Sequence, residues 1–363
     1  MPHYKFSDLA YNITDKKMPE PGDEKTYIGL EHLDSGSLAV TRWGGEIELK
    51  GQKLVMKKGD ILFGRRNTYL RRAAIAPHDG IFSAHGMIFR PKTEVIDPDY
   101  FPFFIASDYF MNAAIKISVG SLSPTVNWKT LKELEFDIPS LEQQRESAKI
   151  LKAANELKES YQALLLKTDD LVKSQFIEMF GDPYDNPMAW NECTLQDVLV
   201  GKPSNGFFAK PADYSEDGNA GIVCVGDVVN RKYSNVENLR RANADDKQLS
   251  KFKVKYGDIL FCRSSLVKEG IAKASIIPDN CPENTLFECH VIRLPLNIEK
   301  VIPEYVQAFT TLEYFRTQMM DKSKTATMTT IGQKDVVSGK IFIPSMELQK
   351  KFVKFTDQND KSK

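Results

Sequence analysis

The sequence lacks any long apolar segment. None of its apolar runs approaches the ~20 residues that a membrane-spanning helix needs. The first five residues, Met1 to Lys5, are followed by polar and charged residues, whereas a secretory signal would continue with an apolar stretch. The five cysteines are odd in number and scattered along the chain, which argues against a disulfide framework and for a reducing compartment. We therefore expect a cytoplasmic protein.

The sequence also lacks an excess of charge of either sign. It has 49 Lys and Arg and 49 Asp and Glu, so its formal net charge is zero. The apolar fraction of 42% and the charged fraction of 27% are near globular averages, which excludes a disordered charged tail. A length of 363 residues predicts two or three domains. A neutral chain can still bind nucleic acid, but its basic surface must then be local.

Motifs of catalysis and metal binding are scarce. There is no Walker loop and no Gly-x-Ser-x-Gly. Asp182-Pro183-Tyr184 is similar to the Asp-Pro-Pro-Tyr of amino-methyltransferases but lacks the second proline, and we interpret it as a helix stop. Cys281, Cys289 and His290 have neither the spacing nor the further ligand of a metal site. We expect no metal, no cofactor and no catalytic residue on this chain.

The chain repeats itself over units of about 140 residues, the size of a domain. Gly59-Asp60-Ile61-Leu62-Phe63 recurs as Gly257-Asp258-Ile259-Leu260-Phe261. Several later matches share a single offset, namely Tyr109-Phe110 with Tyr314-Phe315, Thr125 with Thr330, Lys129 with Lys334, and Ile138-Pro139-Ser140 with Ile343-Pro344-Ser345. The repeat therefore predicts two similar domains.

Each repeat predicts an α+β domain. The Gly-Asp dipeptide indicates a tight turn before a buried Ile-Leu-Phe strand. Met87 to Phe89 and Val291-Ile292 are further strand candidates. Residues 99–115 and 304–320 have a helical pattern, and each segment directly follows a proline, Pro98 or Pro303.

Two residue types within the repeats could suggest catalysis. His85 and His290 fall at corresponding places, and we interpret them as core or turn histidines rather than as general bases. Asp60 and Asp258 each follow a turn glycine, so a carboxylate that bonds its own backbone is the better interpretation.

A long helix is predicted between the repeats. Ser140 and Gln143 form a capping-box signature, no Pro or Gly occurs from Leu141 to Phe180, and Gly181 is a stop signal. Such a helix would be ~60 Å long. A 4-3 pattern of apolar residues, typical of a coiled coil, runs along it. This apolar stripe consists of Ile150, Ala154, Leu157, Tyr161, Leu164, Thr168 and Leu171. The helix is either a plain spacer or, as we favour, a spacer that also binds a partner. A second, shorter helix is expected from Met346.

Basic residues gather around the repeated strand. Residues 57–72 hold six basic residues and one acidic residue, and residues 247–273 hold seven basic and two acidic residues. Two equivalent basic runs in a neutral chain favour two phosphate-facing patches over a merely solvated surface. Two corresponding loops, 118–125 and 322–330, add hydroxyls and lysines that can meet phosphates or base edges. The candidate DNA-binding residues are Lys57, Lys58, Arg65, Arg66, Tyr69, Arg71, Arg72, Ser121, Ser123, Lys253, Lys255, Arg263, Ser264, Lys268, Lys322, Lys324, Thr325 and Thr327.

These features together resemble the specificity subunit of type I restriction–modification systems. The resemblance rests on Gly-Asp-Ile-Leu-Phe in both repeats, on Phe-Asp-Ile-Pro-Ser-Leu-Glu-Gln-Gln at 136–144, and on the ending Leu171 to Pro183, and it covers nearly the whole chain. It implies two target recognition domains that each read half of a bipartite DNA site, and paired helices that act as a ruler and dock two modification subunits. It further implies that S-adenosylmethionine, Mg²⁺ and ATP are bound by the modification and restriction subunits.

The resemblance gives the domain assignment. We expect target recognition domains at 1–139 and 188–343, a central conserved helix at 140–182 and a shortened C-terminal helix at 344–363. Leu157, Tyr161, Leu164 and Leu171 would face a docked subunit, and a second copy of this chain is an alternative occupant of the stripe. Alternative functions are a specificity subunit of a modification-only or other phage-defence system, and a protein-interaction scaffold that does not bind DNA.

Overall fold

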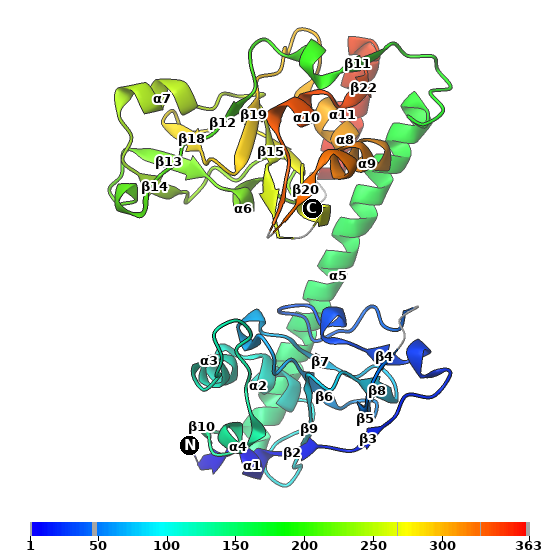
Figure 1. The fold of residues 1–363 in the computed structure, drawn as a ribbon, viewed down its shortest axis with the longest axis vertical. Coiled ribbons are helices and arrows are strands. Elements are labelled where there is room, and N and C mark those ends of the chain that lie inside the picture. Colours follow the sequence, from blue (N-terminus) through cyan, green and yellow to red (C-terminus); the bar gives the residue numbers. More distant parts are fainter. Residues whose placement is uncertain (1, 46–48, 267, 327, 361–363) are drawn as a thin grey trace. The chain divides into compact units, whose positions relative to one another are not determined.

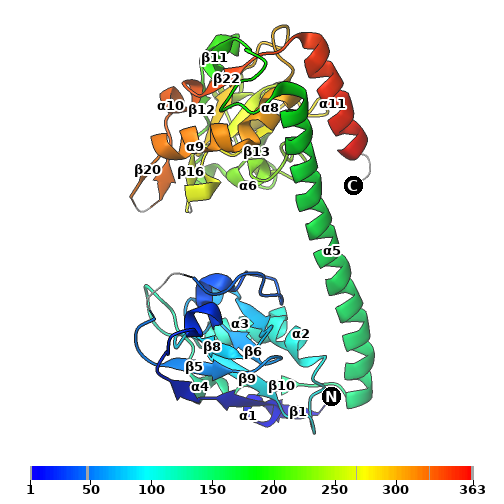
Figure 2. The same cartoon turned by 90° about the vertical axis from the view of Figure 1, so that its right-hand side faces the viewer.

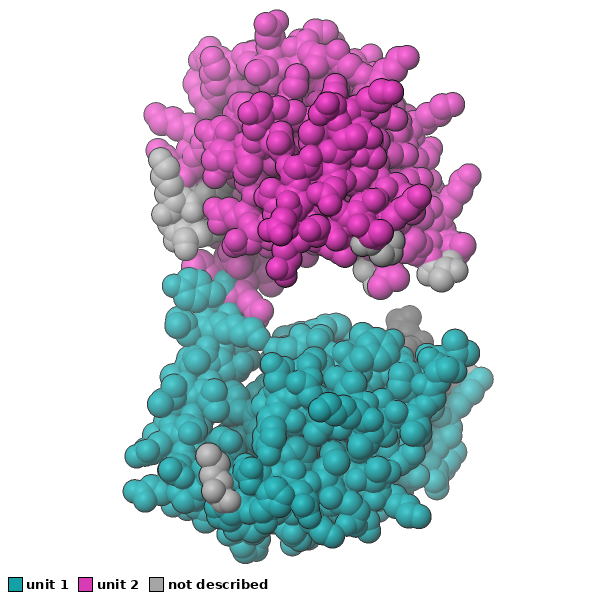
Figure 3. All heavy atoms as spheres, turned by 90° about the vertical axis from the view of Figure 1, so that its left-hand side faces the viewer, with its two compact units in different colours: residues 1–161 teal, residues 162–363 magenta. Residues whose placement is uncertain are grey.

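The computed structural model describes residues 2–45, 49–266, 268–326 and 328–360. The chain divides into two compact units, residues 1–161 (unit 1) and 162–363 (unit 2), which Figure 3 colours separately. Each unit mixes β-sheets with helices, and a long helix, α5, crosses the boundary between them (Figure 1). The predicted α+β class with a long helix between two β-rich domains is confirmed. In the described part of the chain, no helix is both long and apolar enough to cross a membrane.

Unit 1 is built on two four-stranded sheets, with strand orders β2-β9-β6-β7 and β3-β5-β8-β4, and on a separate β1-β10 pair. Its strands are β1 (His3–Lys5), β2 (Ala10–Ile13), β3 (Lys16–Lys17), β4 (Tyr27–Ile28), β5 (Lys53–Met56), β6 (Ile61–Phe63), β7 (Ala73–Ile75), β8 (Gly80–Phe82), β9 (Met87–Pro91) and β10 (Glu135–Asp137). Its helices are α1 (Phe6–Leu9), α2 (Phe101–Ala106), α3 (Asp108–Lys116), α4 (Trp128–Leu131) and the first half of α5 (Leu141–Phe180).

Unit 2 repeats this plan with sheets β12-β19-β15-β17 and β14-β13-β18 and a β11-β22 pair, and it adds a small β16-β21-β20 sheet. Its strands are β11 (Glu192–Thr194), β12 (Ser204–Asn205), β13 (Ala220–Val223), β14 (Arg240–Ala242), β15 (Ile259–Cys262), β16 (Ser264–Ser265), β17 (Ala274–Ile276), β18 (Thr285–Phe287), β19 (Val291–Leu294), β20 (Lys324–Thr325), β21 (Thr329–Thr330) and β22 (Lys340–Phe342). Its helices are α6 (Val225–Val228), α7 (Asp246–Phe252), α8 (Pro303–Thr311), α9 (Glu313–Lys322), α10 (Gln333–Val337) and α11 (Met346–Asp360).

The repeated Gly-Asp-Ile-Leu-Phe segment forms the central strand of the main sheet in each unit. Gly59 and Gly257 take positive φ angles of 89° and 81°, as a tight turn before a strand requires. The following strands, β6 and β15, are at most 1% exposed and pair antiparallel with β9 and β19. The pairing register is the same, since Phe63 lies opposite Met87 and Phe261 opposite Ile292. The predicted turn and strand are therefore confirmed in both units.

The single helices predicted at 99–115 and 304–320 are wrong, because each segment forms two helices. The break lies at equivalent residues, Ser107 and Leu312, whose ψ angles of 153° and 147° are extended rather than helical. Ser107 makes the break favourable, since its hydroxyl donates to the Phe104 carbonyl at 2.6 Å and accepts from the Phe110 amide at 3.2 Å. A side chain that bonds its own backbone in this way competes with helix continuation.

Helix α5 begins and ends where the sequence predicts, at Leu141 and Phe180. Ser140 and Gln143 exchange the capping-box hydrogen bonds, and Gly181 ends the helix with a φ of 81°. At its far end Phe176 and Phe180 are fully buried in the core of unit 2. There the ring of Phe352 on α11 packs 5.4 and 5.6 Å from theirs, and the two helices lie side by side in Figures 1 and 2.

Candidate nucleic-acid interface

The central strand of each main sheet separates the basic residues that the sequence places in one run. In unit 1, Lys57 and Lys58 precede the turn into β6, whereas Arg65 and Arg66 follow the end of that strand. At about 3.3 Å per residue, the three-residue strand β6 alone spans about 10 Å between the two groups. The same division holds in unit 2, where Lys253 and Lys255 precede β15 and Arg263 follows it. Each basic run therefore supplies two separate groups of cations.

At the entrance to each strand, the repeated aspartate is buried and forms an ion pair with an arginine. Asp60 is 2% exposed, accepts from the Lys57 amide at 2.8 Å, and meets the Arg90 guanidinium through two hydrogen bonds of 2.8 and 2.9 Å. Asp258 does the same with the Lys255 amide at 2.7 Å and with Arg293 at 2.6 and 3.2 Å. The interpretation as a turn carboxylate is confirmed, and the pairing with an arginine is an addition to it.

The two arginine partners do not come from equivalent positions. Arg90 lies directly after Phe89, the partner of Ile61, so it faces Asp60 across the strands. Arg293 lies opposite Leu260, two residues beyond Asp258. Burial raises the pKa of Asp258, and the nearby Arg293 opposes this shift. Because the arginine changes place between the repeats, comparison of the two halves could not reveal the pair.

At the other end of each strand, the chain adds a small three-stranded element. In unit 2 this is the β16-β21-β20 sheet, in which Ser264 and Lys324 both pair with Thr330. The hydroxyls of Thr325 and Thr329 lie 2.9 Å apart on β20 and β21. This element brings the hydroxyl-rich loop 322–330 next to the residues that follow β15.

Unit 1 has the same element in a shorter form. Isolated bridges join Arg66 to Thr125 and Val119 to Thr125, at positions equivalent to the pairings in unit 2. The Val126 amide donates to the Arg65 carbonyl at 2.9 Å, just as the Ile331 amide donates to the Arg263 carbonyl at 3.1 Å. The loop 118–125 is thereby held beside the end of β6. We call the two equivalent regions the strand-end surfaces: residues 65–72 with 118–125 in unit 1, and the described residues of 263–268 with those of 322–330 in unit 2.

The candidate side chains differ in how free they are. Among the described residues, the exposed candidates whose side chains form no ion pair or hydrogen bond are Lys57, Lys58, Arg66, Tyr69, Ser121, Lys255, Lys268 and Lys324. Others are tied to the protein: Arg71 to Asp108 and Asn112, Lys253 to Glu283, Arg263 to the Cys289 carbonyl, and Lys322 to Ser338. Thr325 is exposed, Arg65, Arg72 and Ser123 are half-buried, Ser264 is buried, and Thr327 lies outside the described residues.

The repeated histidines border the strand-end surfaces. His85 and His290 are exposed turn residues directly before Gly86 and β19, so they are not part of the core. The Nδ1 atom of His290 lies 3.1 Å from the Ser264 hydroxyl. The interpretation as turn histidines is confirmed, and the structure places His290 beside a candidate DNA-binding residue, which the sequence pattern did not indicate.

A stacked arginine is a second feature that the sequence did not reveal. Arg240, the first residue of β14, has its guanidinium carbon 3.4 Å from the centroid of the Tyr214 ring. Burial is the main cause that raises the pKa of Tyr214, and the positive charge of Arg240 opposes this shift. The pair belongs to the second sheet of unit 2, because Arg240 lies in the edge strand β14.

The cysteines of this chain are poorly suited to nucleophilic or ligand chemistry. Burial is the first cause that raises the pKa of each thiol, and it brings that of Cys224 to about 12. A raised pKa keeps a thiol protonated and unreactive. Within the described ranges, no group of three or more His, Cys, Asp or Glu side chains is placed to hold a metal ion.

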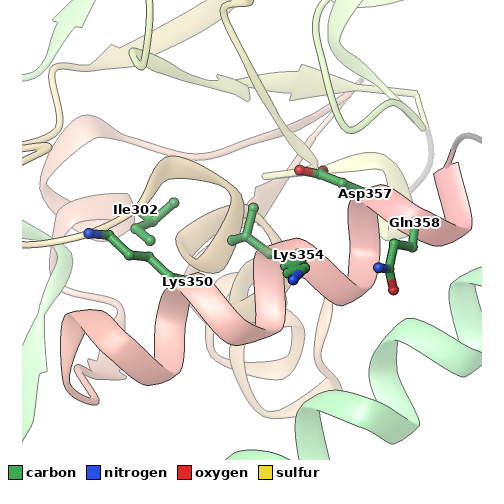
Figure 4. Close-up of a pocket in the computed structure, with 6 residues that line it drawn as sticks. Ile302, Lys350, Lys354, Asp357 and Gln358 are labelled. Atoms are coloured by element: carbon green, nitrogen blue, oxygen red, sulfur yellow. The ribbon is translucent and has the colours of Figure 1, made fainter.

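Two hollows of unit 2 have none of the candidate residues in their linings. One, of about 410 Å³, runs along α11 between Ile302, Lys350, Val353, Lys354, Asp357 and Gln358 (Figure 4). Asp357 in this hollow is already engaged by Lys232 at 3.0 Å. Another hollow is lined by Tyr233, Tyr256 and Glu304, and the Tyr233 hydroxyl donates to the Glu304 carboxylate at 2.8 Å. Neither hollow therefore forms part of the candidate surface.

The apolar stripe of α5 is open along its middle. Leu157, Tyr161, Leu164 and Leu171 are 59%, 55%, 47% and 46% exposed. A row of large apolar side chains on one helix is typical of a surface that another helix covers.

Comparison with known proteins agrees with these features. Residues 12–165 match the model of the type I restriction modification DNA specificity domain. The chain is 22% identical over 299 residues to the specificity subunit of the type I restriction enzyme EcoKI from Escherichia coli (strain K12). That match covers 78% of this chain and 62% of the relative, so the chain spans less than two thirds of the relative's length.

A solved structure with the same fold supports the assignment. The S subunit of the type I restriction–modification system from M. genitalium is 13% identical, with a TM-score of 0.52 over 99% of this chain and 89% of that one. At this identity the likeness concerns the fold alone, with two β-rich domains and a long helix between them. Residues 12–165 thus match a type I restriction modification DNA specificity domain, and the chain as a whole is similar to type I restriction–modification specificity subunits.

Proposed function

We propose that this chain is a DNA-recognition subunit in which each unit reads one half of a bipartite site. The observation that carries the proposal is the duplicated strand-end surface, which places exposed cations and hydroxyls at the same end of the central strand in both units. The match of residues 12–165 to a DNA specificity domain supports it for unit 1, and the repeated sheet order extends it to unit 2.

The charge distribution suits DNA. Cations on a protein of zero net charge must be gathered locally to attract phosphates, and they are gathered here around the two central strands. Phosphate contacts would position each unit, whereas hydroxyls and guanidinium groups can reach base edges and distinguish sequences. The two strand-end surfaces differ in residue type, since Arg66 in unit 1 corresponds to Ser264 in unit 2. The two half-sites should therefore differ in sequence.

The partners follow from the family. Two modification subunits would dock on the apolar stripe of α5, which is exposed and needs cover. They would carry S-adenosylmethionine and methylate adenine, and restriction subunits with Mg²⁺ and ATP would join the same complex. This chain itself would hold no cofactor and catalyse no reaction, and it would act in the cytoplasm. A second copy of this chain is an alternative occupant of the stripe.

Methylome sequencing tests this function. The full chain is expressed with the modification subunit encoded beside it in a host free of adenine methylation. We expect a split motif with two different half-sites and a fixed gap, whereas a contiguous or palindromic motif would contradict the two-reader architecture. No methylation, together with no sequence-selective DNA binding by the purified complex, would favour a protein scaffold. Protection without DNA cleavage in the presence of the neighbouring genes would identify a modification-only system.

A further inference from the structure

Arg240 of unit 2 is fixed in place by an aromatic ring. Its guanidinium carbon lies 3.4 Å from the centroid of Tyr214, which is the separation of two stacked planar groups. The backbone holds the pair together, because Arg240 and Ala242 belong to β14 and a bridge joins Ala242 to Tyr214. β14 is the edge of its sheet, pairing with β13 (Figure 1). Because the stacking already restricts the Arg240 side chain, less conformational entropy is lost when the guanidinium binds a ligand.

The hydrogen-bond donors of Arg240 are nevertheless unused. The side chain is exposed, and among the described residues no hydrogen bond or ion pair of its guanidinium is found. Other arginines already use their donors. Arg241 donates from Nε to the Gly218 carbonyl at 2.7 Å, and Arg293 donates to the Asp258 carboxylate. In unit 1, Arg42 donates to the Asp34 carboxylate at 2.7 and 2.8 Å. Arg240 thus combines a fixed plane with free N–H groups.

A fixed and open guanidinium suits one kind of ligand. Its parallel N–H groups match two acceptors in one plane, which on DNA are the O6 and N7 atoms of guanine or two oxygens of a phosphate. The free cations of the strand-end surface of unit 2, Lys268 and Lys324, are point charges on flexible stems. Of these three groups, Arg240 is therefore the best prepared for a geometrically defined contact.

Resting on the function proposed above, we propose that Arg240 binds a planar pair of acceptors in the half-site that unit 2 reads, and that Tyr214 is its positioning residue. The stack lies on the second sheet of unit 2, outside both basic runs that the sequence indicates. Unit 2 would then contact its half-site with two elements, the strand-end surface and the edge strand β14.

The test uses the complex of the full chain with its modification subunits and a duplex that carries its methylation motif. Arg240→Ala should weaken binding about tenfold or more, as expected when one bidentate contact is lost. Arg240→Lys should not restore it, because an ammonium cannot make the planar pair. Arg241→Ala is the matched control, since it removes the same charge from the adjacent residue, and it should have a clearly smaller effect. Circular dichroism of each variant verifies folding.

Substitutions of Tyr214 test whether its ring positions Arg240. Tyr214→Phe keeps the stacking face and should bind as the unmodified chain does, whereas Tyr214→Ala should weaken binding. The double variant of Tyr214→Ala with Arg240→Ala should bind no worse than Arg240→Ala alone. Full additivity, or a loss on Arg240→Ala with none on Tyr214→Ala, would overturn the positioning role.

Two modified duplexes separate the sources of the acceptors. If the contact is to guanine, 7-deazaguanine in the unit 2 half-site should lower the affinity of the unmodified complex and leave Arg240→Ala unaffected. If it is to phosphate, a neutral methylphosphonate linkage should do so instead, and Arg240→Ala should lose affinity equally for all sequences. Equal binding by Arg240→Ala and the unmodified complex would overturn this inference alone. Absence of selective binding by the unmodified complex would instead overturn the proposed function.

Discussion

Gln349 repeats in unit 2 two of the three hydrogen bonds that the Gln144 side chain makes in unit 1. Each side chain is 0% exposed, donates to the carbonyl of the preceding proline (Pro139 or Pro344) at 2.9 or 2.8 Å, and accepts from an amide before the α2 or α8 region at 2.7 or 2.8 Å. The contact ties the start of α5 and the start of α11 to the domain that precedes each helix. It explains why the Ile-Pro-Ser segment and a glutamine recur together.

The first prediction concerns this contact. Gln144→Leu and Gln349→Leu should each lower the free energy of unfolding by about 1–3 kcal/mol, because buried amide and carbonyl groups lose their partner. Urea unfolding followed by circular dichroism measures the change. Gln162→Leu, at an exposed position of α5, is the control and should change stability by less than about 0.5 kcal/mol. Equal effects at all three positions would mean that the contact does not stabilise the units.

The second prediction concerns the buried pair of Asp258 and Arg293. Arg293→Met should cost about 3–5 kcal/mol at pH 7, because it leaves a buried carboxylate without a partner. The pKa of Asp258 is already raised by burial, so the folded state binds its proton more tightly than the unfolded chain does. The contribution of Asp258 to the free energy of unfolding therefore falls as the pH rises from its pKa in the unfolded chain to its higher pKa in the folded protein.

Lower pH should consequently reduce the destabilisation caused by Arg293→Met, because the unpaired carboxylate becomes protonated. The cost of Arg293→Met should be smaller at pH 5 than at pH 7, as measured by urea unfolding at both values. Adding Asp258→Asn to Arg293→Met should remove most of this pH dependence. A cost independent of pH would show that lost packing, rather than the unpaired charge, destabilises the variant.

The third prediction separates the two ends of β6. Arg66 and Lys58 are both exposed cations on the same sequence run, but they lie at opposite ends of the strand. Arg66→Glu should weaken DNA binding by the assembled complex and make its salt dependence shallower. Lys58→Glu introduces the same charge change and should have little effect on fluorescence-anisotropy titrations. A larger loss with Lys58→Glu would place the DNA at the entrance of the strand.

The fourth prediction concerns the apolar stripe of α5. Leu164→Gln should weaken assembly with the modification subunit while changing the free energy of unfolding by less than about 0.5 kcal/mol, because Leu164 is 47% exposed. Leu166 is 67% exposed on the same helix but outside the stripe, so Leu166→Gln is the matched control. Co-purification and light scattering measure assembly. Equal losses for both variants would show that the stripe is not the docking face.

Local sequence signals predicted the parts of the fold that depend on neighbouring residues. The turn at Gly59, the buried strand that follows and both ends of α5 were all predicted, because each rests on backbone freedom, capping or apolar period. The breaks at Ser107 and Leu312 were missed. Leu312 carries no signal at all, since an apolar residue at that place fits a continuous helix equally well.

The parts of the candidate site that depend on contacts between distant segments were not predicted. Arg293 reaches Asp258 from a different strand position than Arg90 uses in unit 1, so the repeat conceals it. Tyr214 and Arg240 meet only because β14 folds onto the loop before β13. The sequence identified the two basic runs as concentrations of charge. It did not show that β6 and β15 divide each run into two separate groups of cations.

The placement of the aspartate–arginine pair at the entrance of each central strand, opposite the strand-end surface, bears on how such a protein can evolve. Residues that hold the sheet together and residues that would meet DNA occupy different ends of one short strand. A substitution in the loops 118–125 or 322–330 therefore leaves the buried pair and its hydrogen bonds untouched. New target sequences could arise by successive loop changes, each with little loss of stability, while the duplicated sheet stays the same.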